Sequence, residues 1–184
     1  MRIVSGKYRG RTIKAPGNLP TRPTTDMAKE ALFNILNNHV YFDQIKVLDL
    51  FCGTGNISFE FYSRGSHRVV SVDDHYACIN FVKKTSEELQ AKGVIEAIKS
   101  DAIKFIKRSR EKYDVIFADP PYAFEKYDDL IQSIFENDIL EENGLVVVEH
   151  DSKHDFENSP FYFNHRKYGT VNFSFFSAKP SQDS

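Results

Sequence analysis

The residues best suited to chemistry are Asp119-Pro120-Pro121-Tyr122, which follow the mostly apolar run 113–118. That run has the length of a buried strand, so the four residues lie at its carboxyl end, where open α/β sheets bind ligands. Two successive prolines remove two backbone donors and restrict φ, which makes the loop stiff. A stiff loop can hold the Asp119 carboxylate and the Pro120 carbonyl near one point, beside the ring of Tyr122. Two acceptors and a flat ring suit an exocyclic amino group of a nucleobase, although an ordinary proline turn shares this short pattern.

A second motif is the glycine-rich turn 52–56, which follows another expected buried strand, 46–51. Helical spacing of apolar side chains begins at Ile57, so the turn joins a strand to a helix N-terminus. Glycines in such a turn let a ligand approach the backbone closely. Ser58 occupies the third glycine position of a dinucleotide fingerprint, and Asp49 precedes the turn. A carboxylate there is unfavourable for a pyrophosphate but suits a cationic amino-acid ligand.

Carboxylates also follow the next two expected strands. Strand 68–72 ends in Asp73, at the spacing of a carboxylate that binds ribose hydroxyls in either NAD or S-adenosylmethionine. Strand 94–99 is followed by Asp101, which can accept from an adenine amino group or cap the helix that begins at Ala102. Four successive strands therefore end in a carboxylate, the others being Asp49 and Asp119. Independent helix caps would not mark the same edge of every strand, so the pattern favours one ligand site along that edge.

The order of these motifs, with the Asp-Pro-Pro-Tyr loop after the fourth strand, resembles S-adenosylmethionine-dependent methyltransferases that act on amino groups. The N-terminal motifs narrow the resemblance to the RsmD-type bacterial 16S rRNA guanine-N2 methyltransferases. These N-terminal motifs are the segments 1–11, 21–26 and 29–34. The segment 49–55 and the shorter segments 63–65 and 167–169 also resemble this family. The resemblance extends from Met1 to about Phe176, nearly the whole chain.

The resemblance implies transfer of a methyl group from S-adenosylmethionine to the exocyclic N2 amine of a guanine in 16S rRNA, within the small ribosomal subunit or an assembly intermediate. It implies that the catalytic residues are Asp119, Pro120 and Tyr122. The cofactor-binding residues that it implies are Asp49, Phe51, Gly53, Gly55, Asp73, Asp101 and Ala102. Two alternatives stay open: a DNA adenine-N6 methyltransferase, because the same loop suits an adenine amine, and a non-catalytic RNA-binding or assembly factor.

The implied fold is α/β, a doubly wound, seven-stranded, Rossmann-like class I methyltransferase with an N-terminal β-hairpin and helix extension. We expect residues 1–40 to form the RNA-facing extension, 41–178 the S-adenosylmethionine-binding domain and 179–184 a flexible tail. The extension should contain a hairpin and then a helix over 26–37, whose buried face carries Ala31, Leu32, Ile35 and Leu36. Strand 144–149 and a closing hairpin near Gly169 complete the sheet, the last strand antiparallel as in the family.

Charge is distributed unevenly along the chain. The net charge is −2, yet residues 1–29 hold seven Lys or Arg against one Asp. Such asymmetry predicts a basic arm that contacts RNA phosphates, although a solvated arm without a partner has the same composition. The RNA-binding residues that we predict are Arg9, Arg11, Arg22 and Lys29. Met27 and Lys29 stand where the family often has arginine, so contacts from this helix would be rearranged.

Composition indicates one core, because the chain has 184 residues, 41% of them hydrophobic. No apolar stretch reaches the length of a membrane span, and the charged N-terminus lacks the apolar region of a secretory signal. The two cysteines suggest neither a disulfide framework nor a metal site, and no metal is expected. We therefore expect a cytoplasmic protein without a membrane partner, monomeric by default. His75 and His150 lie beyond strand ends and are interpreted as structural or incidental.

Overall fold

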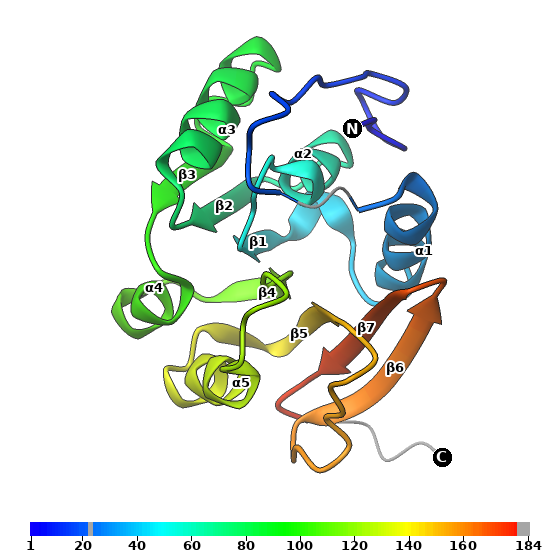
Figure 1. Ribbon diagram of the computed structural model, residues 1–184, viewed down its shortest axis with the longest axis vertical. Helices are drawn as coiled ribbons and strands as arrows, with labels where there is room; N and C mark the ends of the chain where they lie inside the picture. The colour runs from blue at the N-terminus through cyan, green and yellow to red at the C-terminus, as the bar shows by residue number, and fades with distance from the viewer. Residues whose placement is uncertain (22–23, 180–184) are drawn as a thin grey trace.

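The computed structural model describes residues 1–21 and 24–179. Its centre is a seven-stranded sheet with the strand order β3-β2-β1-β4-β5-β7-β6 (Figure 1). The strands are β1 (Lys46–Leu50), β2 (Arg68–Asp73), β3 (Ile95–Lys99), β4 (Tyr113–Ala118), β5 (Leu140–His150), β6 (Tyr162–Tyr168) and β7 (Val171–Phe176). The α-helices are α1 (Asp26–Leu36), α2 (Asn56–Ser63), α3 (Tyr76–Glu88), α4 (Ala102–Arg108) and α5 (Tyr127–Glu136), and a short 3₁₀ turn spans Phe42–Gln44.

The topology confirms the doubly wound prediction. Strands β1 to β5 pair in parallel, and β7 pairs antiparallel with both β5 and β6. Chain order runs outward from β1 to β3 and then restarts on the other side of β1 with β4. The carboxyl ends of β1 and β4 therefore flank the topological switch point, where open α/β sheets bind ligands.

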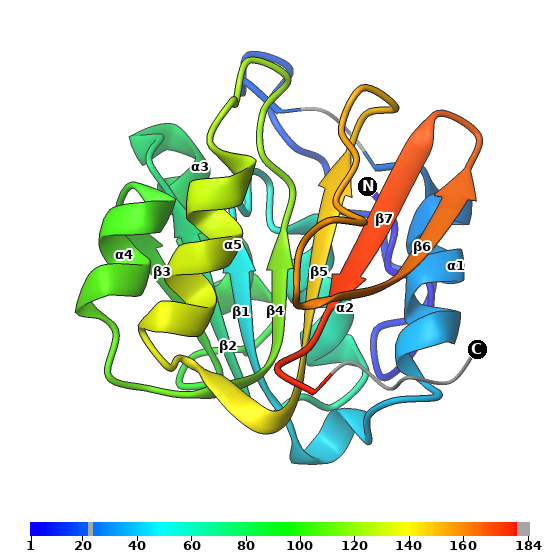
Figure 2. The ribbon, with the colours of Figure 1, turned by 90° about the horizontal axis from the view of Figure 1, so that it is seen from below.

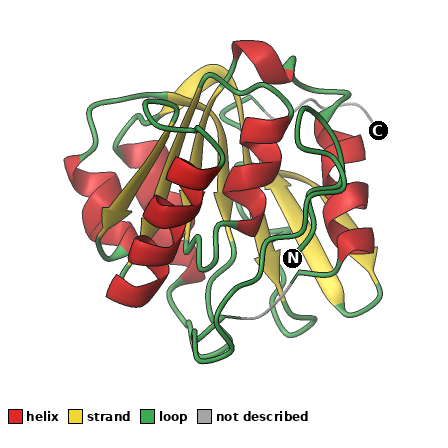
Figure 3. Ribbon diagram, turned by 90° about the horizontal axis from the view of Figure 1, so that it is seen from above, coloured by secondary structure: helices red, strands yellow, loops and turns green. Residues whose placement is uncertain are grey.

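Helices cover both faces of the sheet, as Figures 2 and 3 show. Helices α1, α2 and α3 pack on one face with sheet residues such as Val47, whereas α4 and α5 pack on the other with residues such as Leu48. Successive side chains of a strand point to opposite faces, so β1 supplies both layers from adjacent residues. Phe173, Phe175 and Phe176 of β7 are fully buried and serve as core packing.

The N-terminal arm, residues 1–21, lies against α2, and the expected hairpin pairs only at its open end, where the Ile3 N–H donates to the Arg11 carbonyl and the Ile13 N–H to that of Met1. A single antiparallel bridge joins Arg2 to Thr12. The backbone N–H groups of Val4 and Ser5 instead donate to the Glu60 carboxylate of α2, at 2.9 and 3.0 Å. Ile3, Ile13 and the α1 residues are buried in the same cluster as the sheet, so the first 40 residues share its core.

Several sequence-based boundaries need correction. Helix α1 ends at Leu36, one residue before the predicted end. Its buried residues are Ala28, Lys29, Leu32, Phe33 and Leu36, which confirms Leu32 and Leu36 of the predicted face, whereas Ala31 and Ile35 are only partly buried. Strand β5 begins four residues earlier than expected, at Leu140, and a register irregularity in its pairing with β4 explains why alternation failed to reveal the start. The closing hairpin is as expected, turning between Tyr168 and Val171. Most of the predicted tail lies outside the described residues.

Within the part of the chain that the structure describes, no helix is both long and apolar enough to cross a membrane.

Lys29 corrects one predicted RNA contact. Its side chain is fully buried, and its ammonium forms an ion pair with Glu60 at 3.3 Å. The same Nζ donates to Asn56 Oδ1 at 2.8 Å and to the backbone carbonyl of Arg2. Burial lowers the pKa of Lys29, and the neighbouring Glu60 carboxylate opposes that shift. A side chain in this position fastens the arm to α2 and cannot reach a nucleic acid, so the prediction at Lys29 is wrong.

Candidate active site

A cavity of about 550 Å³ lies at the carboxyl ends of β1, β2, β4 and β5, at the switch point. It brings together most of the residues that the sequence pointed to: Asp49, Phe51, Gly53, Asp73, Asp101, Asp119, Pro120 and Tyr122. Gly55 and Ala102 are not among its lining residues. Residues that lie far apart in the chain therefore form one site because parallel strands deliver their ends to one edge.

The turn after β1 is open enough to receive a ligand. Gly53 and Gly55 have φ values of +52° and +77°, a region that favours glycine. A Cβ at Gly55 would stand 2.7 Å from Phe59 Cε2, and one at Gly53 would stand 3.0 Å from Thr21 Cγ2. Gly55 thus serves the packing of α2, while Gly53 keeps the cavity wall free of a side chain. This cradle fits the predicted nucleoside cofactor.

Asp73, the last residue of β2, is held by backbone donors. Its Oδ2 accepts from the N–H of Gly53 at 2.8 Å, and its Oδ1 accepts from the N–H of His75 at 2.9 Å. A carboxylate has about four acceptor positions, so two bonds within the protein leave capacity for ribose hydroxyls. The side chain is also near His75 Nδ1, at 3.2 Å. The structure therefore places Asp73 where the predicted role requires it.

Asp49 lies beneath the turn and is almost fully buried. Burial raises the pKa of Asp49 to about 7; a hydrogen bond from Ser58 Oγ opposes this shift, and the negative charges of Asp119 and Asp73 add to it. A buried carboxylate beside the negative charges of two others favours a cationic ligand. The site can therefore accommodate the ammonium of an amino-acid ligand.

Asp101 and Ala102 begin α4. Asp101 is the N-cap residue, with Oδ1 accepting from the N–H of Lys104 at 2.9 Å, and the side chain is exposed at the cavity wall. The capping role is confirmed, and a second acceptor oxygen is available for a ligand. Ala102 is buried in the hydrophobic cluster on the α4 face. Its methyl group therefore cannot line the site, and only its backbone N–H, at the first turn of the helix, could take part.

The loop after β4 forms the opposite wall. Pro120 is buried, Asp119 is half-buried, and the Tyr122 ring is 68% exposed at the mouth of the cavity. The Asp119 N–H lies 3.4 Å from the carbonyl of Leu50, so β4 stays beside β1 up to the reactive loop. The rigid part of the loop thus faces the cavity, and its aromatic ring lies where an incoming base could stack.

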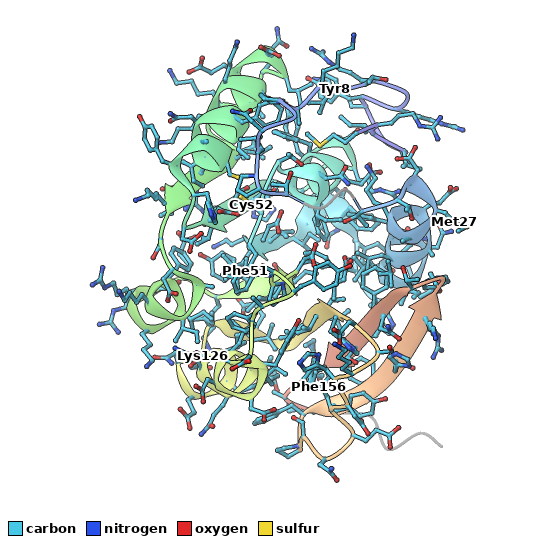
Figure 4. The ribbon with its side chains drawn as sticks, in the orientation of Figure 1. Tyr8, Met27, Phe51, Cys52, Lys126 and Phe156 are labelled. Carbon is cyan, nitrogen blue, oxygen red and sulfur yellow. The ribbon has the colours of Figure 1, made fainter. Side chains whose placement is uncertain are left out.

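Phe51 joins the two halves of the site. It has a positive φ of 62°, which is uncommon for a bulky residue and stores strain at the end of β1. Its ring meets Phe124 of the loop after β4 edge-on, with 5.2 Å between the centroids. Figure 4 shows Phe51 and Cys52 near the middle of the molecule, whereas Tyr8 lies on the outer side with the arm. The strained turn therefore rests on an aromatic contact with the loop after β4.

Sequence reasoning missed two parts of the wall. Leu19, Pro20 and Thr21 of the arm cover the turn after β1, although no motif marked them. Glu149, His150 and Asp151 at the end of β5 complete the far side. A signal existed for Glu149, because it is a carboxylate at a strand end like the four that were recognised. Arg22 lies outside the described residues, and Arg9 and Arg11 are exposed.

His150 is held by its surroundings. Its Nδ1 is 2.7 Å from the carbonyl of Asp151, and its Nε2 is 2.8 Å from Ser174 Oγ. Burial lowers the pKa of His150. Both ring nitrogens therefore have partners, in keeping with a structural role.

The switch-point cavity, the glycine cradle, and the carboxylates at the ends of β1 and β2 define a class I methyltransferase that uses S-adenosylmethionine. The chain belongs to the family described as "Conserved hypothetical protein 95", the RsmD family, whose model matches residues 1–177. It is 33% identical over 152 residues to the ribosomal RNA small subunit methyltransferase D of Haemophilus influenzae, covering 81% of this chain and 78% of the relative.

Solved structures agree with this fold. A hypothetical protein of Thermus thermophilus superimposes with a TM-score of 0.81 at 25% identity, covering 97% of this chain and 99% of that one. A 16S rRNA N2 methyltransferase of Thermus thermophilus, solved in complex with AdoMet and guanosine, superimposes with a TM-score of 0.64 at 20% identity. That match covers 86% of this chain and 45% of the other, and it supports the fold alone.

Proposed function

We propose that this protein transfers a methyl group from S-adenosylmethionine to the exocyclic N2 amine of a guanine in 16S rRNA. The observation that carries the proposal is the position of Asp119, Pro120 and Tyr122 in the same cavity as Asp49 and Asp73. Acceptors for an amine thus lie opposite the carboxylates that suit a cofactor. The name of one relative, a ribosomal RNA small subunit methyltransferase, supports rRNA of the small subunit as the substrate.

The site's contribution to the reaction follows from the weak nucleophilicity of the amine, whose lone pair is delocalised into the ring. S-adenosylmethionine supplies an electrophilic methyl group on a sulfonium. Hydrogen bonds from the amine to the Asp119 carboxylate and the Pro120 carbonyl favour a pyramidal nitrogen and stabilise the positive charge that develops there. Stacking on Tyr122 holds the base in line. After transfer the nitrogen loses one proton, either directly to water or through Asp119.

The base must leave its stack to enter the cavity, which a loop or bulge of rRNA permits at low cost. A folded RNA also needs a contact surface next to the cavity. A second groove, of about 690 Å³, lies between the N-terminal arm and α3. Its charged lining residues are Arg11 and Lys14 of the arm and Lys84 and Glu88 of α3, and Leu19 lines both hollows.

We propose that RNA next to the target nucleotide occupies this groove. Its excess of positive charge is complementary to phosphates, and the partly buried ring of Phe81 lies in its wall. Arg9 is an exposed neighbour on the arm that can extend the contact. The rest of the chain is acidic, so binding to naked RNA should be weak, and we propose the assembled small subunit, in the cytoplasm, as the substrate.

The test is transfer of a labelled methyl group to small ribosomal subunits that lack the modification, followed by nucleoside analysis. We expect N2-methylguanosine in 16S rRNA. Asp119→Ala should abolish transfer while cofactor binding persists, and Asp128→Ala, at an exposed position on α5, is the matched control. N6-methyladenine in the product, or undiminished turnover by Asp119→Ala, would overturn the proposal.

A further inference from the structure

The end of β5 places a second carboxylate beside Asp119. The parallel register of β4 and β5 pairs Phe117 with Val147 and Ala118 with Val148. The next residues along are Asp119 and Glu149. Because side chains alternate, Glu149 leaves the sheet on the face to which Val147 points, and Asp119, just beyond the end of β4, lines the same cavity. Neighbouring strands are about 4.8 Å apart, so the two acid groups belong to one row at the cavity wall.

Glu149 is held firmly in that row. Only 4% of the residue is exposed, yet it lines the cavity. Its backbone is fixed by β7, since Glu149 pairs with Phe173, and the preceding residue, Val148, pairs with Ala118 of β4. Both acids act on Tyr127 of α5, which also lines the cavity: burial raises the pKa of its phenol to about 12, and the negative charges of Asp119, Asp151 and Glu149 add to that shift.

The strand order separates Glu149 from the cofactor carboxylates. The order is β2-β1-β4-β5, so Glu149 lies three strands from Asp73. At the usual strand spacing this amounts to roughly 14 Å, which puts Glu149 at the end of the cavity away from the predicted ribose site. Glu149 therefore lies on the side of the cavity that the target base would occupy.

Two acceptors in a row match the donors of guanine. The Watson–Crick edge of guanine presents the N2 amine and the N1–H side by side, whereas adenine presents an acceptor at N1. A carboxylate has about four acceptor positions, so bonds within the protein leave capacity for one more donor. An acceptor that faces an acceptor is repelled, and buried polar groups left without a partner discriminate strongly between bases.

We propose that Glu149 is the residue that selects guanine, by accepting a hydrogen bond from the base N1–H while Asp119 and Pro120 accept from the N2 amine. This inference rests on the proposed guanine-N2 activity and adds to it the residue that reads the ring. By this proposal Glu149 contacts the substrate. It lies on β5, which carries none of the cofactor motifs and is not followed by the Asp-Pro-Pro-Tyr loop.

The test uses 2-aminopurine, which keeps the amine at C2 but has an acceptor at N1 and no O6. Small subunits are reconstituted with 16S rRNA that carries guanosine or 2-aminopurine riboside at the position that the wild-type protein methylates. We expect wild type to prefer guanosine by about 10- to 100-fold in initial rate. Glu149→Gln has an amide that can accept from N1–H or donate to N1, so its preference should fall to within about threefold.

Controls separate the possible failures. Wild type and Glu149→Gln are both given a base analogue that lacks O6. A difference in preference between the two proteins therefore reports on N1. Glu141→Gln alters an exposed glutamate at the other end of β5 and should keep the wild-type preference. Thermal unfolding and cofactor titration establish that Glu149→Gln is folded. An unchanged preference in that variant, with N2-methylguanosine still formed, would overturn the role of Glu149, whereas no methylated guanosine from wild type would overturn the proposed function itself.

Discussion

The Asp73 carboxylate accepts a hydrogen bond from the backbone N–H of Gly53 at 2.8 Å, and so the end of β2 holds the turn after β1. The bond joins two elements that the chain connects only through the whole of α2. One carboxylate therefore both shapes the glycine turn and faces the cofactor cavity.

Asp73→Ala should weaken S-adenosylmethionine binding by about 10- to 100-fold. The substitution removes an acceptor for the ribose and also releases the Gly53 N–H, which would be left with water as its partner. Isothermal titration calorimetry measures the change, with the exposed Asp128→Ala as the control. Equal affinity in wild type and Asp73→Ala would refute the ribose assignment.

Cofactor affinity should depend on pH through Asp49. Burial raises its pKa to about 7 in the protein without cofactor, and an ammonium ligand favours the ionised form. Wild-type affinity should therefore fall as the pH is lowered from 8 to 6, whereas Asp49→Asn should bind weakly at both values. Calorimetric titrations at several pH values give the two profiles. If the cofactor affinity of wild type and of Asp49→Asn changed with pH in the same way, the role of Asp49 would be contradicted.

The same shift has a consequence for stability. The pKa of Asp49 is raised from 3.8 on folding, so between about pH 4 and 7 the folded state retains a proton that the unfolded state releases. The contribution of Asp49 to stability therefore declines as pH rises through that window. At pH 8, Asp49→Asn should raise the melting temperature by about 2–4 °C, and below pH 4 the two proteins should unfold alike. Differential scanning calorimetry without cofactor provides the comparison.

Local sequence patterns predicted the sheet and most of the site, because a strand and the residue that ends it are both determined by neighbouring residues in the chain. A short apolar run reveals a buried strand such as 46–50, and a carboxylate at a parallel strand end faces the ligand edge wherever the strand lies in the sheet. The same rule applies to Glu149, which was overlooked because no familiar motif contains it. The resemblance supplied the antiparallel closing strand, which periodicity does not encode.

What the sequence could not predict depends on contacts between distant segments. The arm covers the cavity at 19–21 because Val4 and Ser5 bind Glu60, more than fifty residues away. Lys29 was assigned to RNA from its charge, since its burial depends on that same distant carboxylate. Charge alone does not distinguish a lysine that binds phosphate from one that neutralises a buried acid.

Lys29→Ala should therefore destabilise the protein rather than specifically weaken RNA binding. It would leave Glu60 with Arg64, at 2.9 Å, and the N–H groups of the arm as partners. Breaking a buried pair typically costs ~3 kcal/mol, or roughly 6–12 °C in melting temperature for a protein of this size. Thermal unfolding measures the loss against Lys83→Ala, at an exposed position. A normal melting temperature with reduced RNA affinity would show that Lys29 contacts RNA after all.

The groove between the arm and α3 offers a matched pair of lysines. Lys83 and Lys84 are consecutive and exposed on α3, but only Lys84 is among the groove residues, with Arg11 on the opposite wall. If RNA lies in the groove, Arg11→Ala and Lys84→Ala together should remove about two phosphate contacts. The slope of log affinity against log salt should then fall by about 1.4–1.8, whereas Lys83→Ala should leave it near the wild-type value. Binding of small subunits, measured between 50 and 200 mM salt, separates the two outcomes. Equal slopes for wild type, the double variant and Lys83→Ala would place the RNA elsewhere on the surface. The slope depends on how many phosphates the protein contacts, whatever the RNA sequence.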